Sequence, residues 1–218
     1  PADARAILAR HDILPAVAVR KALQRPSAVI PPWDPRLAGS RTQIVAAPSQ
    51  SLAAAARAAR QAGCDVEILG DDLEGEARDL GALHARLART SQTRIAASGR
   101  PLLLLSRGEC TVTRRGSGIG GPNAEYVLAA AIELSELPGV CILACDTDGV
   151  DGAAEIAGAY ASPETLATAL HSGLDARKAL AENDAHVFFG KTGGQVVTGP
   201  TLTNVNDFRA ILIHPIDA

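Results

Sequence analysis

Three carboxylates follow one apolar run in the second half of the sequence. Asp146, Asp148 and Asp151 come directly after the run from Val140 to Ala144. Proteins commonly hold Mg²⁺ with one or two carboxylates together with substrate phosphates, so this loop suits phosphoryl transfer. We expect Asp148 and Asp151 to point into a cleft and place the metal, and Asp146 to end its strand. The alternative is that these side chains only cap their own turn.

A glycine-rich loop before a predicted helix is a second candidate site. Gly116, Gly118 and Gly121 match the pattern GxGxxG, and a helix is expected from Pro122 to Leu137. Backbone N–H groups at such a helix start can bind phosphate. A nicotinamide dinucleotide would use the same pattern, but the segment before this loop is polar, whereas that fold begins with a buried apolar strand. A purely structural turn is the third interpretation.

A third polar loop runs from Thr198 to Asp207 and is rich in threonine and asparagine. These side chains could bind a small polyhydroxy acid or a phosphate, or they could only build turns. The five histidines are scattered, without a nucleophile partner or the spacing of metal ligands. We therefore assign no chemistry to them.

The hydrophobic pattern predicts alternating strands and helices around these loops. Strands are expected at 43–47, 65–69, 102–106, 110–115, 140–144 and 209–214, and helices at 2–9, 16–23, 52–62, 74–88, 122–137, 163–171 and 175–182. Arg107-Gly108 is expected to form a tight turn. Strand, helix, strand order is typical of parallel strands joined by right-handed crossovers. The expected fold is α/β, a mostly parallel sheet flanked by helices.

Composition excludes several classes of function. Hydrophobic residues make up 47% of the 218 residues and aromatic residues only 3%, which is typical of helices packed on a buried sheet. The net charge of −3 argues against a nucleic-acid partner. No apolar run approaches the roughly 20 residues of a membrane-spanning helix. Four cysteines without CxxC spacing favour reduced thiols in the cytoplasm.

The start of the chain indicates a fragment. It begins at Pro1 and contains no methionine. We expect residues 1–37 to form a helical lead-in with a proline-rich linker, and residues 38–218 to form the α/β domain.

Several motifs, in order, resemble those of the class II glycerate kinases, a family often labelled hydroxypyruvate reductase. Residues 68–77 are similar to the family's ILGDDLEGEA, 103–113 to LLSGGETTVT, 118–125 to GxGGRNQE, 146–152 to GTDGxDG, 157–159 to AAGA, and 197–207 to VTGPTGTNVND. Residues 101–210 resemble the unit called MOFRL. The resemblance covers nearly the whole chain.

This resemblance implies the second domain of a two-domain enzyme that phosphorylates D-glycerate at its 2-hydroxyl, using ATP and Mg²⁺. The larger N-terminal domain would be missing, so we expect the chain alone to be inactive. Metal ligands would be Asp148 and Asp151. The positions expected to bind substrate or nucleotide are Ser106, Gly108, Glu109, Gly118, Gly120, Gly121, Asn123, Glu125, Thr201, Asn204 and Asp207. The alternatives are an NAD(P)-dependent hydroxypyruvate reductase and a non-catalytic binding or assembly module.

Four positions depart from the family pattern. Pro122 stands where the family has an arginine, a residue suited to binding a transferred phosphate, and Ala124 replaces a glutamine. The catalytic cation is therefore expected to be missing. Arg107 replaces a glycine and could supply a nearby cation, whereas Leu202 replaces a glycine and would narrow its loop.

Overall fold

The computed structural model describes residues 1–25, 30–43, 47–135 and 137–216. The chain divides into two compact units, residues 1–45 and residues 46–218. The strand expected at 43–47 falls largely outside the described residues. In the described parts of the chain, no helix combines the length and apolar character needed to cross a bilayer.

The first unit contains two short helices, α1 (Ala2–Arg10) and α2 (Val17–Leu23), and the 3₁₀ turn η2 (Pro35–Leu37). Both helices agree with the expected positions. None of the three elements buries a side chain, and Leu14 and Trp33 are largely exposed. These elements therefore have no hydrophobic core of their own.

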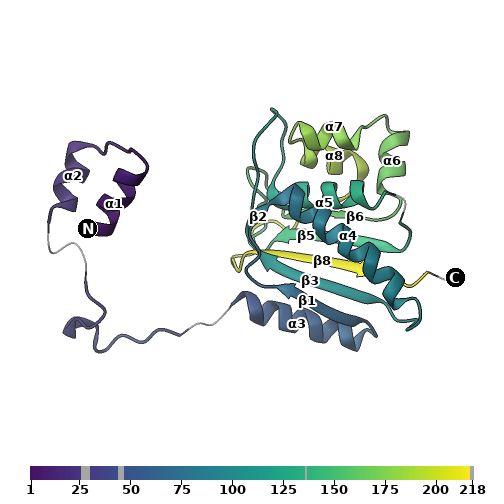
Figure 1. Ribbon diagram of the computed structural model, residues 1–218, viewed down its shortest axis with the longest axis horizontal. Helices are drawn as coiled ribbons and strands as arrows, with labels where there is room; N and C mark the ends of the chain where they lie inside the picture. Colours follow the sequence, from purple (N-terminus) through teal and green to yellow (C-terminus); the bar gives the residue numbers. More distant parts are fainter. Residues whose placement is uncertain (26–29, 44–46, 136, 217–218) are drawn as a thin grey trace. The chain divides into compact units, whose positions relative to one another are not determined.

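The second unit is built on a six-stranded sheet with the order β1-β3-β8-β5-β6-β7 (Figure 1). Its strands are β1 (Asp65–Gly70), β3 (Leu102–Gly108), β5 (Val140–Asp146), β6 (Gly158–Ala161), β7 (Gln195–Val196) and β8 (Asp207–Ile213). Pairing is parallel between β1 and β3 and antiparallel elsewhere, so β1, β3, β5 and β7 run one way and β6 and β8 the other. The α/β class is confirmed, with a mixed sheet in which four strands share one direction.

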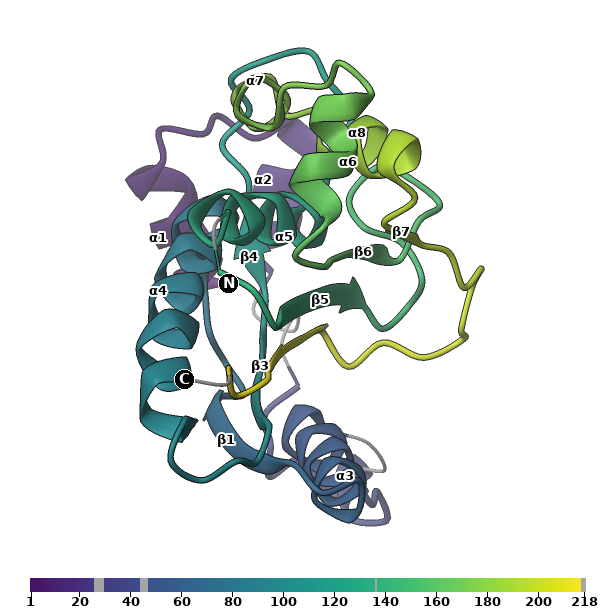
Figure 2. The same cartoon turned by 90° about the vertical axis from the view of Figure 1, so that its right-hand side faces the viewer.

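Helices cover the two faces of the sheet unequally. The helices of this unit are α3 (Pro48–Gln61), α4 (Ala77–Ile95), α5 (Pro122–Glu133), α6 (Thr165–His171), α7 (Ala176–Ala181) and α8 (Ala185–Thr192). Leu104 of β3 packs in the cluster with α4 and α5, whereas its neighbour Leu105 packs with Leu52 and Ala56 of α3. Successive strand residues point to opposite faces, so α3 lies on the other face from α4 and α5 (Figure 2).

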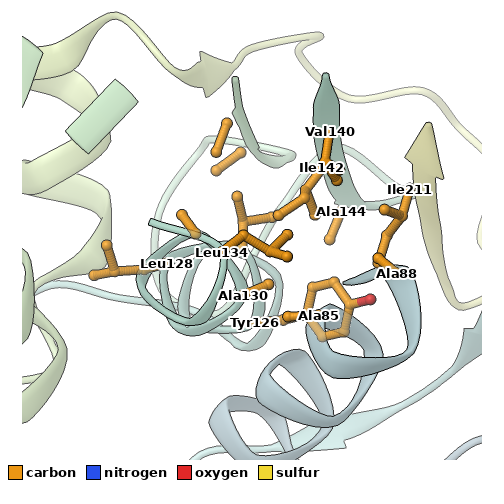
Figure 3. Close-up of a cluster of buried hydrophobic side chains, with 14 of the residues drawn as sticks. Ala85, Ala88, Tyr126, Leu128, Ala130, Leu134, Val140, Ile142, Ala144 and Ile211 are labelled. Carbon is orange, nitrogen blue, oxygen red and sulfur yellow. The ribbon is translucent and has the colours of Figure 1, made fainter. Parts of the chain in front are cut away.

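The main core lies between α4, α5 and the sheet. Figure 3 shows the side chains of α5 facing those of β5, β8 and α4, with the labelled residues Ala85, Ala88, Tyr126, Leu128, Ala130, Leu134, Val140, Ile142, Ala144 and Ile211. Small residues let the two long helices approach closely. A Cβ at Gly81 of α4 would lie 2.3 Å from the carbonyl oxygen of Tyr126.

Several elements differ from those expected. Arg107-Gly108 continues β3 and forms no turn, because β8 pairs with β3 as far as Gly108 opposite Asp207. In place of the strand expected at 110–115, the structure has the two-residue strand β4 (Cys110–Thr111). It pairs with β2 (Gly75–Glu76) in a separate small sheet. Helix α4 starts and ends later than expected, α5 ends earlier, and α8 and β6 have no counterpart in the sequence prediction.

Candidate functional site

The ends of β3 and β5 meet the start of β8 at one edge of the sheet. Gly108 at the end of β3 and Asp146 at the end of β5 both stand opposite Asp207, the first residue of β8. The two strands flank β8 and share one direction. Their carboxyl ends therefore place the loops that follow them side by side, which is where ligands collect in open α/β sheets.

A pocket of about 570 Å³ opens at this edge. This volume is in the range of small-molecule sites. Its walls come from the ends of β3 and β5, the start of β8, α3 and the loop after β7. The lining residues are Ser51, Arg107, Cys145, Asp146, Thr147, Ala157, Thr198, Thr201, Thr203, Val205 and Phe208.

Hydrogen bonds join the loop of residues 197–206 to the end of β5. The hydroxyl of Thr147 accepts the N–H of Val205 at 2.9 Å and donates to the carbonyl of Asn206 at 3.0 Å. The N–H of Thr201 donates to the carbonyl of Asp148 at 3.1 Å, and its hydroxyl donates to the carbonyl of Thr147. The structure thus brings together two of the three polar loops that the sequence singled out.

Asp146 and Asp148 lie next to each other in this loop. One oxygen of Asp148 accepts the N–H of Val150 at 2.8 Å, and the other accepts the amide of Asn204 at 3.1 Å. Asp146 ends β5 and accepts the N–H of Asp148 at 3.0 Å. Burial, with the charge of Asp148 adding to it, raises the pKa of Asp146 to about 6. Asp148 therefore caps its own turn while it remains partly exposed.

Asp151 does not point into a cleft as expected, and its geometry gives no support to the metal role predicted for it. Its side chain is fully buried and accepts the backbone N–H groups of Asn123 and Ala124, both at 2.9 Å. His186 Nε2 lies 3.2 Å from the same carboxylate. The residue before α5, Gly121, has no side chain to cap the helix, so Asp151 supplies that cap from another loop.

The glycine loop is closed by contacts within the chain. The N–H of Gly118 donates to the carbonyl of Glu182 at 2.9 Å, and that of Gly116 to Asn183 Oδ1 at 2.9 Å. A Cβ at Gly118 would lie 2.5 Å from the Cβ of Asp184. The glycines thus allow close packing against residues 182–184, and the N–H groups of Gly116, Gly118 and Ile119 already have partners. Of the three interpretations drawn from sequence, the structural turn accounts best for this geometry.

Three other predicted ligand residues belong to a buried polar network. Glu125 is fully buried and accepts hydrogen bonds from Arg78 at 2.7 Å and from Asn183 at 2.6 Å. The amide of Asn123 donates to Asp207 at 2.7 Å. Buried polar groups are usually hydrogen-bonded, and each of these three side chains has at least one partner within the chain. None of the three is among the residues that line the pocket.

The remaining predicted positions are distributed over the site and its surroundings. Thr201 lines the pocket, and Asn204 stabilises the pocket loop through Asp148. Ser106 is buried within β3, and Glu109 is exposed. Three glycines serve packing: a Cβ at Gly108 would lie 2.0 Å from the carbonyl oxygen of Leu73, and a Cβ at Gly120 or Gly121 would also meet atoms closer than 3 Å.

Sequence reasoning missed Arg209 as part of the site's support. Arg209 is buried, binds Asp207 at 2.6 Å, and lies 5.5 Å from the ring centre of Tyr126. A signal was present, because Asp207 and Arg209 are two residues apart and so share one face of a strand. Burial, partly offset by the bonds from Asn123 and by Arg209, raises the pKa of Asp207.

Comparison with known proteins matches the model of the MOFRL family over residues 102–207. This segment is therefore similar to the MOFRL family. The matched segment runs from β3 to the start of β8 and includes both pocket loops. It agrees closely with the range of 101–210 expected from the motifs.

Relatives of this chain are named either as hydroxypyruvate reductases or as glycerate kinases. An Agrobacterium vitis protein named "putative hydroxypyruvate reductase" is 42% identical over 97% of this chain and 48% of its own length. D-glycerate 2-kinase of Thermotoga maritima is 36% identical over 71% of this chain and 37% of its own length. The crystal structure of a Thermotoga maritima glycerate kinase matches 97% of this chain and 50% of that protein, with a TM-score of 0.80 and 31% identity.

The chain spans about half the length of the relatives it matches. A second solved structure, of a Pyrococcus horikoshii protein, gives a TM-score of 0.73 at 36% identity and has 40% of its length covered. This fold is therefore shared with a glycerate kinase of known structure, and about half of that protein lies outside the matched part.

Proposed function

We propose that this chain is the C-terminal part of an ATP-dependent glycerate 2-kinase that converts D-glycerate to 2-phosphoglycerate in the cytoplasm. The observation that carries this proposal is the pocket at the ends of β3 and β5, with threonine hydroxyls, Asp146 and Arg107 in its walls. Hydroxyl groups and charges of both signs are the chemistry that a small hydroxy acid requires.

The missing half of the protein would supply the ATP site. The glycine loop of this chain is closed by residues 182–184, which leaves it without free N–H groups at Gly116 and Gly118 for a nucleotide phosphate. We therefore expect the isolated chain to fold but to be inactive. The role of the larger N-terminal domain is to provide the nucleotide and to complete the cleft over the pocket.

For Mg²⁺ we propose Asp148 as the ligand on this chain, next to Asp146. Among the described residues, no three His, Cys, Asp or Glu side chains are grouped to hold a metal ion. One or two carboxylates are sufficient where phosphates provide the other oxygens, and the adjacent pair in the pocket loop fits that requirement. When bound, the ion would neutralise charge on the transferred phosphate.

A hydroxypyruvate reductase is the second candidate, favoured by the name of the Agrobacterium vitis relatives. Its nicotinamide cofactor would need a glycine loop with free N–H groups at a helix start. Here the start of α5 is capped by Asp151 and the loop is packed on residues 182–184. The geometry therefore favours the kinase.

The test uses the full-length protein and this chain in parallel. Each is assayed for formation of 2-phosphoglycerate from D-glycerate and ATP, and for NADH oxidation with hydroxypyruvate. We expect phosphorylation by the full-length protein only. NADH oxidation would support the reductase, and turnover by the isolated chain at roughly 1 to 1000 per second would show that its site is complete. Neither activity in the full-length protein would favour the non-catalytic module.

A further inference from the structure

Arg107 is a buried cation on the wall of the pocket. It lies near the end of β3, is only 1% exposed, and lines the pocket together with Asp146 and Thr201. Its Nη2 group donates to the carbonyl of Asn206 at 2.7 Å and to the carbonyl of Val205. Its buried Nε–H group has no hydrogen-bond partner in the structure.

The charge of Arg107 is not balanced by a direct ion pair. Within the described ranges, no carboxylate oxygen lies within 4.0 Å of its guanidinium, because Asp207 is paired with Arg209 and Asp146 bonds to its own loop. Burial lowers the pKa of Arg107, and the more distant charges of Asp207 and Asp146 offset this only in part. A buried charge without a partner is unfavourable, so an anion bound to Arg107 would stabilise it.

The surroundings of Arg107 limit the size and type of that anion. The pocket volume of about 570 Å³ admits a small molecule, and the hydroxyls of Thr201 and Thr203 can donate to or accept from its hydroxyl groups. A guanidinium presents several N–H donors in a fixed plane, which matches the two oxygens of a carboxylate. The neighbouring Asp146 disfavours a highly charged anion.

We propose that Arg107 binds a small oxyanion in this pocket, and specifically the carboxylate of a hydroxy acid. If the proposed function holds, that hydroxy acid is D-glycerate. The related kinases have glycine in this motif position, so Arg107 would be a specificity residue particular to this chain. The two carbonyl bonds of Nη2 hold the guanidinium in place at the pocket wall, where its remaining N–H groups are the donors proposed for the ligand.

The direct experiment follows the Arg107 Nε–H resonance of the wild-type chain by ¹H-¹⁵N NMR, without ATP. The probes are D-glycerate, inorganic phosphate, and glycerol, which has the same number of carbons and lacks the charge. We expect saturable shifts of this resonance with D-glycerate, weaker shifts with phosphate, and none with glycerol. Equal responses to D-glycerate and glycerol, or no response to either oxyanion, would overturn the proposal.

Variants separate the charge of Arg107 from its contacts with the loop. Arg107→Gln should weaken D-glycerate binding by about tenfold to a hundredfold, as expected for the loss of a charge-assisted hydrogen bond. Arg107→Lys should restore part of that loss, and Arg100→Gln, at an exposed arginine before β3, should bind like the wild type. Unchanged binding of D-glycerate in Arg107→Gln would show that Arg107 only holds the loop of residues 197–206 in place.

The result can be told apart from a failure of the proposed function. Arg107-dependent binding of D-glycerate in a full-length protein without kinase activity would retain the oxyanion site and remove the kinase assignment. Kinase activity of the full-length protein, with D-glycerate binding unchanged in Arg107→Gln, would retain the kinase assignment and remove the oxyanion site. If Arg107→Gln does not fold, the wild-type Nε–H titration still decides the proposal.

Discussion

The carboxylate of Asp151 accepts the backbone N–H of Ala124 at 2.9 Å, although the two residues are 27 positions apart in the sequence. This bond connects the acidic loop after β5 to the first turn of α5. Asp151 therefore stabilises the fold, although the sequence suggested that it is a metal ligand.

Replacement of Asp151 by alanine should strongly destabilise the fold. The change would leave two buried N–H groups without acceptors, and would remove the partner of His186. Breaking a buried charged interaction of this kind costs about 3 to 5 kcal/mol in free energy of unfolding. Urea denaturation measures it, with Asp148→Ala as the partly exposed control, for which about 1 kcal/mol or less is expected. Similar losses in both variants would contradict this assignment.

Gly118→Ala tests whether the glycine loop serves packing or phosphate binding. The new Cβ would lie 2.5 Å from the Cβ of Asp184 and 2.7 Å from the carbonyl oxygen of Glu182. Overpacking of this kind costs about 1 to 3 kcal/mol of stability. Gly39→Ala is the control, because nothing lies within 4 Å of the position its Cβ would take. A Gly118→Ala protein of normal stability that loses ATP affinity in the full-length enzyme would restore the phosphate-binding interpretation.

His84 should make the fold sensitive to mild acid. Its Nδ1 lies 2.8 Å from the Tyr126 hydroxyl, and burial, reinforced by the charge of Arg209, lowers the pKa of His84 to about 4. The folded state thus keeps His84 neutral where the unfolded chain, with a pKa near 6.5, takes up a proton. The contribution of neutral His84 to the free energy of unfolding is therefore fully present above pH 6.5. It is lost as the pH falls from 6.5 through 4, by up to about 3 kcal/mol.

The measurement compares urea denaturation of the wild type and His84→Gln between pH 7.5 and 4. Carboxylates contribute to the acid loss of both proteins, so the difference between the two curves reports His84. We expect the wild type to lose more stability than the variant over this range. Parallel curves would show that His84 is not held neutral.

Pro122→Arg should raise the activity of the full-length protein. Pro122 is the first residue of α5, where its missing N–H costs little, so the melting temperature should change by only a few degrees. An arginine there would return the cation of the related kinases, with a gain on the order of 10³ to 10⁵ in rate by analogy with arginine fingers.

The companion change Ala124→Gln is better tested separately. Ala124 is fully buried, so a glutamine would be overpacked and would lower stability by about 1 to 3 kcal/mol. Equal rates for the wild type and Pro122→Arg would show that position 122 is not where the kinase cation acts.

The sequence alone determined the fold class and the family resemblance, because both rest on local patterns. Apolar runs marked the strands β1, β3 and β5, and Pro122 marked the start of α5. The motifs from residue 102 onward placed the MOFRL segment almost to its observed ends. Such signals depend on neighbouring residues only, so they can be read before the chain is folded.

Only the tertiary structure decided which polar residues face a pocket and which hold the fold together. Asp148 and Asp151 have the same side chain three positions apart, yet one is partly exposed and the other caps a helix from a distance. From the sequence, the glycine loop could bind a phosphate, but in the folded chain it packs against residues 182–184. These differences depend on partners remote in sequence, and burial then decides whether a carboxylate binds the chain's own N–H groups or remains available to a ligand.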